Sequence, residues 1–191
     1  DSLLIENSAM GFTAANGIIL GEGFQVKNTT FSSKDETWTQ PWGENKKNRN
    51  HYNEMAVNLT NEDHVQLTLR FRVFDDGVGF RYEYTVPTID SLLITDELTT
   101  FRFHRDGTSW SIPASAETYE LLYQQQPISE VETANTPITF KTADGVYGSI
   151  HEAALYDFPE MTLKQIGHYT LKAELAPWPD GIKARKGNHF T

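Results

Sequence analysis

The stretch 65–86 constrains the fold more than any other part of the sequence. Every second residue from Val65 to Val73 is apolar, and the alternation resumes from Val78 to Tyr84 after the dipeptide Asp76-Gly77. A period of two places the apolar side chains on one face of a strand. Asp-Gly is typical of a tight turn in which the glycine takes a positive φ. The segment therefore predicts a β-hairpin with one buried face.

The same combination of short alternating runs and turn residues recurs along the chain. Further strands are expected at 17–20, 24–29, 99–103, 138–140, 146–150 and 171–175, and further Asp-Gly turns at 106–107, 144–145 and 180–181. The strands follow one another without intervening helices, which favours an antiparallel sandwich over a parallel βαβ sheet. We predict an all-β fold with few or short helices. No repeat or low-complexity linker interrupts it, so residues 1–191 are predicted to form one domain.

Two stretches do not fit a simple strand pattern. Residues 117–125 place Tyr119 and Leu122 at helical spacing, with Ser115 as a possible cap, so the stretch reads as a short helix or an irregular strand. Residues 35–52 are mostly polar and contain Trp38 and Trp42. This second stretch predicts a long ordered loop.

Composition excludes several classes of function. The 191 residues carry 26 acidic and 16 basic side chains, a net charge of −10, and no Lys/Arg cluster focuses a positive field. Such a balance disfavours nucleic-acid binding. The chain contains no cysteine, which excludes disulfides and thiolate metal sites but does not fix a compartment. No apolar run has the length of a membrane span, and no signal peptide opens the sequence.

Self-contained catalysis is disfavoured as well. The sequence has no G-x-S-x-G, P-loop, G-x-G-x-x-G or H-E-x-x-H motif, and its six histidines are scattered.

Glu152 is the most informative single residue. If the strand after Asp144-Gly145 continues, Glu152 shares a face with Gly148 and Ile150 and emerges at the edge of the core. A desolvated carboxylate requires a cation, hydrogen-bond donors or a proton. The sequence leaves two readings open: a strand-end glutamate bonded to an arginine or a backbone amide, or a ligand of a hard cation such as Ca²⁺. Because Ca²⁺ takes roughly 6–8 oxygens, one glutamate would need ligands from elsewhere.

Trp178 is the second candidate, because it lies between Pro177 and Pro179 on a stiff loop. Its ring can stack on a sugar, plug a domain interface, or pack over the end of the sandwich. Trp38 and Trp42 pose the same choice. We take Trp178 and His151, the neighbour of Glu152, as candidate substrate-binding residues.

Several of these residues belong to motifs that resemble glycoside hydrolase family 97. The motifs occur in the order found in that family and cover nearly the whole chain: QPWGE at 40–44, RNHYNE at 49–54, FRVFDDGVGFRY at 71–82, WSIP at 110–113, YGSIHEAAL at 147–155, and PW at 177–178. Each motif alone is weak, but the ordered set is specific.

The resemblance implies an N-terminal β-supersandwich, related in shape to galactose mutarotase, that precedes a (β/α)₈ catalytic barrel and a small C-terminal β domain. It also implies calcium-dependent, exo-acting α-glucosidase or α-galactosidase activity whose catalytic carboxylates lie on the barrel. In that family the N-terminal domain gives one glutamate to the calcium ion, and Glu152 matches it. The barrel is absent from this sequence, and segments that the family places before Asp1 are expected to be missing too.

Three functions follow as alternatives. The chain is an accessory domain that completes a hydrolase site beside the barrel of the same polypeptide, with calcium and an α-linked oligosaccharide as partners. Alternatively, it is an independent carbohydrate-binding module or a purely structural domain. The resemblance also leads us to expect a periplasmic or outer-membrane location in a Bacteroidetes-like bacterium.

Overall fold

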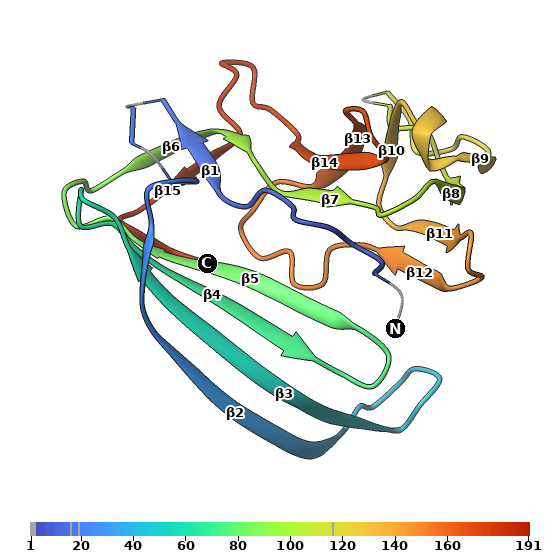
Figure 1. The fold of residues 1–191 in the computed structure, drawn as a ribbon, viewed down its shortest axis with the longest axis horizontal. Helices are drawn as coiled ribbons and strands as arrows, with labels where there is room; N and C mark the ends of the chain where they lie inside the picture. Colours follow the sequence, from blue (N-terminus) through green and yellow to red (C-terminus); the bar gives the residue numbers. More distant parts are fainter. Residues whose placement is uncertain (1–2, 16, 19, 116) are drawn as a thin grey trace. The chain divides into compact units, whose positions relative to one another are not determined.

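In the computed structural model, β-strands dominate the described residues, which are 3–15, 17–18, 20–115 and 117–191 (Figure 1). The described helical structure is one short 3-10 turn, η1 (Ile128–Glu130). Every strand pair with a described register is antiparallel, as for β4 with β5 and β13 with β14. The all-β antiparallel prediction is therefore confirmed. Within the described residues, no helix has the length and apolar character needed to cross a membrane.

The chain divides into two compact units, which are described separately. The first unit comprises residues 1–21 and 92–185, and the second comprises residues 22–91 and 186–191.

The second unit is built on one five-stranded sheet of order β16-β5-β4-β3-β2. Its strands are β2 (Gln25–Thr39), β3 (Lys47–Thr60), β4 (Gln66–Val73), β5 (Val78–Thr85) and β16 (His189–Phe190). The predicted hairpin is β4–β5, with Val73 opposite Val78. Its alternating face is buried at Leu67, Tyr82 and Tyr84 and becomes exposed toward the turn.

The turn chemistry at two of the Asp-Gly pairs differs from the prediction. Gly145 and Gly181 have φ values of 85° and 80°, as expected, but Gly77 is not in the positive-φ region. Four residues connect β4 to β5, and Phe74 N–H donates to the carbonyl of Gly77. Gly107 begins a strand instead of a turn, where an added Cβ would lie 2.4 Å from the Lys141 carbonyl oxygen.

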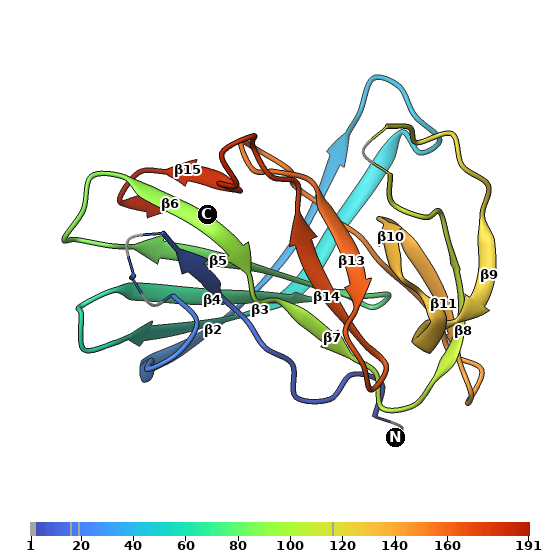
Figure 2. The ribbon, with the colours of Figure 1, turned by 90° about the horizontal axis from the view of Figure 1, so that it is seen from above.

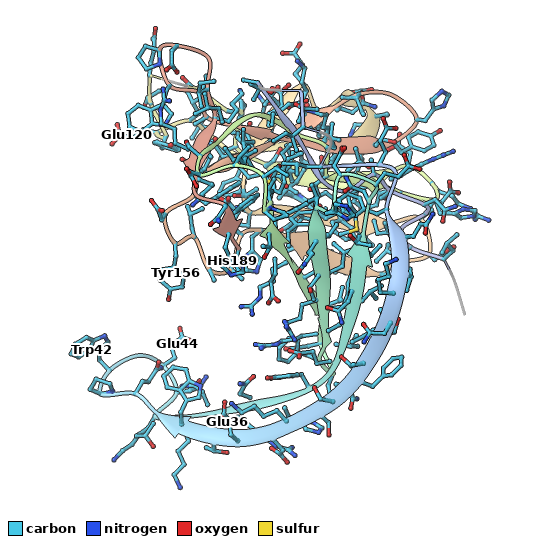
Figure 3. All side chains as sticks on the ribbon, turned by 90° about the vertical axis from the view of Figure 1, so that its left-hand side faces the viewer. Glu36, Trp42, Glu44, Glu120, Tyr156 and His189 are labelled. Carbon is cyan, nitrogen blue, oxygen red and sulfur yellow. The ribbon has the colours of Figure 1, made fainter. Side chains whose placement is uncertain are left out.

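The prediction of a long loop at 35–52 is wrong. β2 and β3 form one long hairpin, and only residues 40–46 lie outside its strands; Figure 3 shows Trp42 and Glu44 on this connection. β2 is exposed along its entire length, so the sequence pattern revealed only its beginning, within the strand expected at 24–29, and not the rest. Backbone pairing and cross-strand polar contacts hold it instead, including a bidentate Arg49–Asp35 pair at 2.8 and 2.7 Å.

One polar face of this sheet carries a charged network. Arg70 donates to Glu54 at 2.6 Å and to Glu83 at 2.8 Å, and Arg72 donates to Glu54 at 2.8 Å. The hydrogen bonds from Arg70 and then Arg81 lower the pKa of Glu83 to about 2, even though burial opposes the shift. These pairs bridge three adjacent strands, β3, β4 and β5, and fix their register.

The first unit contains three sheets, of order β1-β6-β15, β10-β13-β14-β7 and β12-β11-β8-β9. Their strands are β1 (Phe12–Ala14), β6 (Leu92–Glu97), β7 (Thr100–Arg102), β8 (Gly107–Ser111), β9 (Gln124–Pro127), β10 (Thr133–Asn135), β11 (Ile138–Thr142), β12 (Tyr147–Ile150), β13 (Met161–Gln165), β14 (Thr170–Leu175) and β15 (Ala184–Lys186). Figure 2 shows β13 and β14 side by side, as their pairing requires.

The apolar core of the first unit joins its two four-stranded sheets. It contains Phe140 and Ile138 of β11 together with Leu163 of β13 and Leu171 of β14. Phe103 packs edge-on against Phe140, with ring centroids 4.9 Å apart. Side chains from two sheets in one core define a β-sandwich.

The structure also tests the predictions for two short stretches of the first unit. Residues 117–123 form no helix and run irregularly into β9. Of the two predicted alternatives, the short helix is therefore wrong. The strand expected at 17–20 is absent at Gly17, Ile18 and Leu20, and residue 19 lies outside the described residues.

Gly148→Ala tests the packing of this sandwich. An added Cβ would lie 2.4 Å from Cζ of the buried Phe140 ring, so the free energy of unfolding should fall by about 1–3 kcal/mol. Gly79→Ala is the matched control, because Gly79 is also a strand glycine but has open space around it, and it should change stability by no more than about 0.5 kcal/mol. Chemical denaturation measures both; equal stability of the two variants would contradict this packing.

Candidate functional site

Glu152 lies just beyond the end of β12. The strand stops at Ile150, which pairs with Ile138, and residues 151–160 then run without regular structure to β13. The expected continuation of the strand is therefore wrong, and Glu152 does not share a strand face with Gly148 and Ile150. Its position is set instead by the irregular segment, where it is half-buried.

The carboxylate of Glu152 is held by a backbone amide. Its Oε1 accepts a hydrogen bond from the N–H of Met161 at 3.0 Å, and no ion pair is present for it among the described residues. Burial raises the pKa of Glu152, and the negative charge of Glu160 adds to the effect, while the Met161 amide opposes it. The structure therefore shows amide bonding and no arginine clamp, which leaves a carboxylate without a counter-charge.

A second carboxylate, Glu97 on β6, interacts electrostatically with Glu152. Its side chain is only 8% exposed and accepts a hydrogen bond from Thr99 Oγ1 at 2.6 Å. Burial raises the pKa of Glu97 to about 7, and the charge of Glu152 adds to this, whereas Thr99 and Lys172 act in the opposite direction. The negative charge of Glu152 thus disfavours the ionisation of Glu97.

Reasoning from the sequence missed Glu97, and a register irregularity explains why. In the β1–β6 pair, Glu97 lies opposite Phe12 and Asp96 opposite Thr13, but Ile94 lies opposite Ala14. This shift leaves Thr95 as an extra residue, as in a β-bulge, and reverses the inward and outward alternation along β6. Simple alternation from Ile94 would have placed Glu97 on the exposed face.

His151 and Trp178 both belong to the first unit and both are exposed. His151 Nδ1 lies 2.7 Å from the backbone oxygen of Glu152, which requires the proton on Nδ1. Trp178 is held in a turn: its N–H donates to Ile182 at 2.8 Å, and its carbonyl accepts from Gly181 at 2.9 Å. The backbone at Trp178 is therefore held by hydrogen bonds, the ring of His151 is hydrogen-bonded at Nδ1, and the proposed roles of both residues in substrate binding stay predictions.

Calcium requires more ligands than this site supplies. Within the described part of the chain, no group of three or more His, Cys, Asp or Glu side chains is arranged to hold a metal ion. A half-buried carboxylate without a counter-charge fits the hard oxygen ligand that Ca²⁺ prefers. Glu152 therefore fits as one ligand of a site whose other ligands come from elsewhere.

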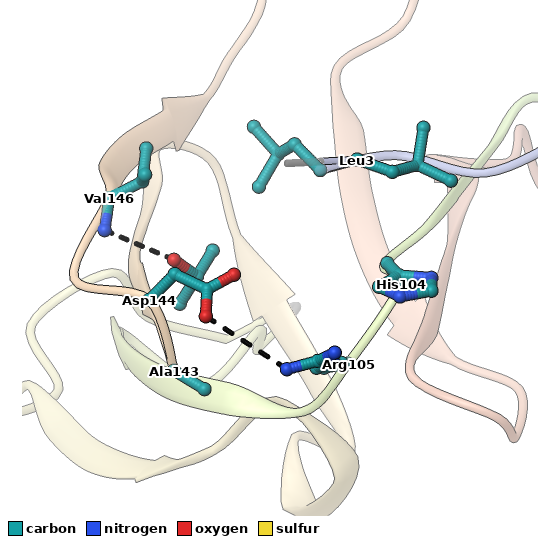
Figure 4. Close-up of a pocket in the computed structure, with 8 residues that line it drawn as sticks. Leu3, His104, Arg105, Ala143, Asp144 and Val146 are labelled. Atoms are coloured by element: carbon teal, nitrogen blue, oxygen red, sulfur yellow. Dashed lines mark hydrogen bonds and ion pairs between the residues drawn. The ribbon is translucent and has the colours of Figure 1, made fainter. Parts of the chain in front are cut away.

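The pocket in Figure 4 does not involve these residues. It is lined by Leu3, Leu4, His104, Arg105, Thr142, Ala143, Asp144 and Val146. Arg105 and Asp144 approach to 3.9 Å across it.

The fold and the site together define a β-sandwich domain that presents a carboxylate at a loop and lacks a metal cluster of its own among the described residues. The glycosyl-hydrolase 97 N-terminal family matches residues 1–188, and the chain belongs to that family. The resemblance inferred from the ordered motifs is thereby confirmed.

Solved structures and curated proteins agree with this assignment. A glycoside hydrolase family 97 enzyme from Pseudoalteromonas sp. strain K8, solved with acarbose, is 36% identical with a TM-score of 0.94, over 98% of this chain and 29% of that one. A retaining alpha-galactosidase from Bacteroides thetaiotaomicron is 24% identical over 92% of this chain and 28% of its own length. A beta-arabinopyranosidase, at 19% identity and a TM-score of 0.84, covers 96% of this chain and 33% of that one and shares the fold. The chain thus spans about a third or less of each of these relatives.

The raised pKa of Glu97 predicts an unusual pH dependence of stability. Because the folded state holds this proton up to about pH 7 and the unfolded state loses it near pH 4.5, the free energy of unfolding should fall as pH rises between these values. The difference corresponds to a loss on the order of 3 kcal/mol. Denaturation in EDTA at pH 4.5–8 should show this decline in the wild type and a clearly smaller decline in Glu97→Gln, in which the raised pKa of Glu152 remains.

The exposed Glu117 provides the control, and Glu117→Gln should keep the wild-type profile. If the free energy of unfolding of Glu97→Gln falls with pH as much as that of the wild type, groups other than Glu97 cause the decline.

Proposed function

We propose that this chain is an accessory domain that completes the active site of a family 97 glycoside hydrolase. In this proposal, Glu152 gives one oxygen ligand to a calcium ion whose remaining ligands come from the catalytic barrel of the same polypeptide. When bound, such an ion stabilises negative charge and holds carboxylates in place.

The observation that carries the proposal is the electrostatic environment of Glu152. Its carboxylate is half-buried, has one amide donor, and experiences the negative charge of Glu160. Because burial of an uncompensated charge costs free energy, a cation would stabilise this arrangement. The Met161 amide meanwhile fixes Oε1, so Glu152 is oriented before any ion arrives.

The substrate follows from the family. One relative is named a retaining alpha-galactosidase, and solved family 97 enzymes contain panose or acarbose. We therefore propose an α-linked oligosaccharide as substrate of the whole enzyme, with glucosidase and galactosidase activity both open. His151 and Trp178, both exposed, are the proposed contacts to sugar. A periplasmic or outer-membrane location is part of the same proposal.

Two alternatives carry less support. An independent carbohydrate-binding module requires an exposed aromatic platform that binds sugar without a second module. A purely structural domain would satisfy Glu152 internally. The Met161 amide does so at Oε1, but no cationic side chain pairs with the carboxylate among the described residues.

Glu152→Gln in the full-length enzyme tests the calcium ligand. Glutamine keeps an oxygen that can accept the Met161 N–H, so the fold should persist, while loss of the charge should weaken calcium affinity by about 10- to 100-fold. Calcium titration by calorimetry measures the affinity, and the calcium concentration required for hydrolysis should rise in parallel.

Glu160→Gln is the matched control, because it removes a nearby negative charge that is not the proposed ligand. Calcium affinity should change less in Glu160→Gln than in Glu152→Gln. A wild-type calcium response in Glu152→Gln would remove the proposal.

The isolated chain should not hydrolyse p-nitrophenyl α-glucoside or α-galactoside. Glycoside hydrolysis requires two carboxyl groups flanking the scissile bond, and Glu97, the carboxylate coupled to Glu152, is buried. Release of p-nitrophenol measures this, with the full-length enzyme as positive control; sustained turnover by the isolated chain would contradict the accessory role.

A further inference from the structure

Three irregular segments of the first unit are joined at one residue, Glu160. The segments are 117–123, 151–160 and 176–182. Tyr119 Oη donates to Glu160 Oε2 at 2.6 Å, and the N–H of Ala176 donates to the Glu160 carbonyl at 3.2 Å. The Met161 amide, next in the chain, holds Glu152. Hydrogen bonds thus tie the three segments together beside the proposed calcium ligand.

These segments expose an unusual amount of apolar surface. Leu122 is 88% exposed and Tyr156 is 82% exposed. The exposed large apolar or aromatic side chains of the three segments are Tyr119, Leu121, Leu122, Tyr123, Leu155, Tyr156 and Trp178. Single exposed apolar residues are ordinary, but a concentration of them marks an interaction surface. Tyrosine and tryptophan in particular are enriched at protein interfaces.

The aspartate and glutamate side chains within the three segments are not matched by any lysine or arginine of the same segments. Segments 117–123 and 151–160 carry five carboxylates, Glu117, Glu120, Glu152, Asp157 and Glu160, and no lysine or arginine. Segment 176–182 adds Asp180, which forms an ion pair with Arg185 outside the segment. A complementary surface must therefore combine apolar groups with basic side chains or a divalent cation.

We propose that these three segments, joined at Glu160, form the surface on which the remaining module of the same polypeptide docks. This inference rests on the proposed function. The occupant follows from the chain's share of its relatives: the family 97 enzymes continue for more than twice the length matched here, since this chain covers 28% and 29% of two of them. Glu152 lies within the middle segment, so the apolar contact and the calcium ligand belong to one surface.

Hydroxyl-radical footprinting of the full-length polypeptide in EDTA tests the docking surface. The oxidation rates of Leu122 and Tyr156 are compared with that of Phe31 of β2, which lies in the second unit and is 77% exposed. Each rate is first divided by the oxidation rate of the free amino acid. Burial in an interface core should slow Leu122 and Tyr156 about tenfold relative to Phe31. Equal normalised rates, or equal protection of all three residues, would overturn the inference.

A second sample with maltose separates docking from sugar binding. Protection already present without maltose supports docking, whereas protection that requires maltose identifies a sugar platform and overturns the inference. The measurement needs neither calcium nor activity, so it is independent of Glu152→Gln. Protected Leu122 and Tyr156 combined with a wild-type calcium response in Glu152→Gln would keep the docking surface and reject the calcium ligand.

Discussion

The apolar core between the two four-stranded sheets of the first unit is the constraint on which the candidate site depends. Phe140 of β11 packs against Phe103 and leaves so little space that only a glycine fits at position 148 of β12. This packing fixes the end of β12, and Leu163 and Leu171 fix β13 and β14 from the other sheet. The segment between β12 and β13 is thus anchored at both ends, which positions Glu152 without a strand of its own.

The local electrostatics set Glu152 apart from an ordinary surface glutamate. In the network of Arg70, Glu54 and Glu83, for example, arginines compensate the carboxylates and the pKa of Glu83 falls to about 2. At Glu152 and Glu97 the pKa values rise instead, because burial and the repulsion from nearby carboxylates outweigh the opposing hydrogen bonds and the charge of Lys172. A half-buried carboxylate with no cationic partner among the described residues is consistent with a cation supplied from outside the chain.

The sequence-based predictions were right where burial of one face orders an element and wrong where other contacts order it. The β4–β5 hairpin was predicted because burial of one face imposes alternation on its sequence. The β2–β3 hairpin was predicted as a loop because β2 is exposed on both faces and is held by backbone pairing and side-chain pairs such as Arg49–Asp35. Glu152 was found from its motif, whereas Glu97 was missed because a register shift in β6 turned it inward.

The sequence by itself determined the all-β class, the β4–β5 hairpin and membership of the family, since alternation, turn residues and ordered motifs are local properties of the chain. Only the tertiary structure decided that Glu97 and Glu152, far apart in sequence, share one electrostatic environment, and that three irregular segments meet at Glu160. These contacts between residues far apart in sequence depend on strand register and on the packing of distant sheets. Both arise from the sum of many long-range contacts, which no local pattern of residues specifies.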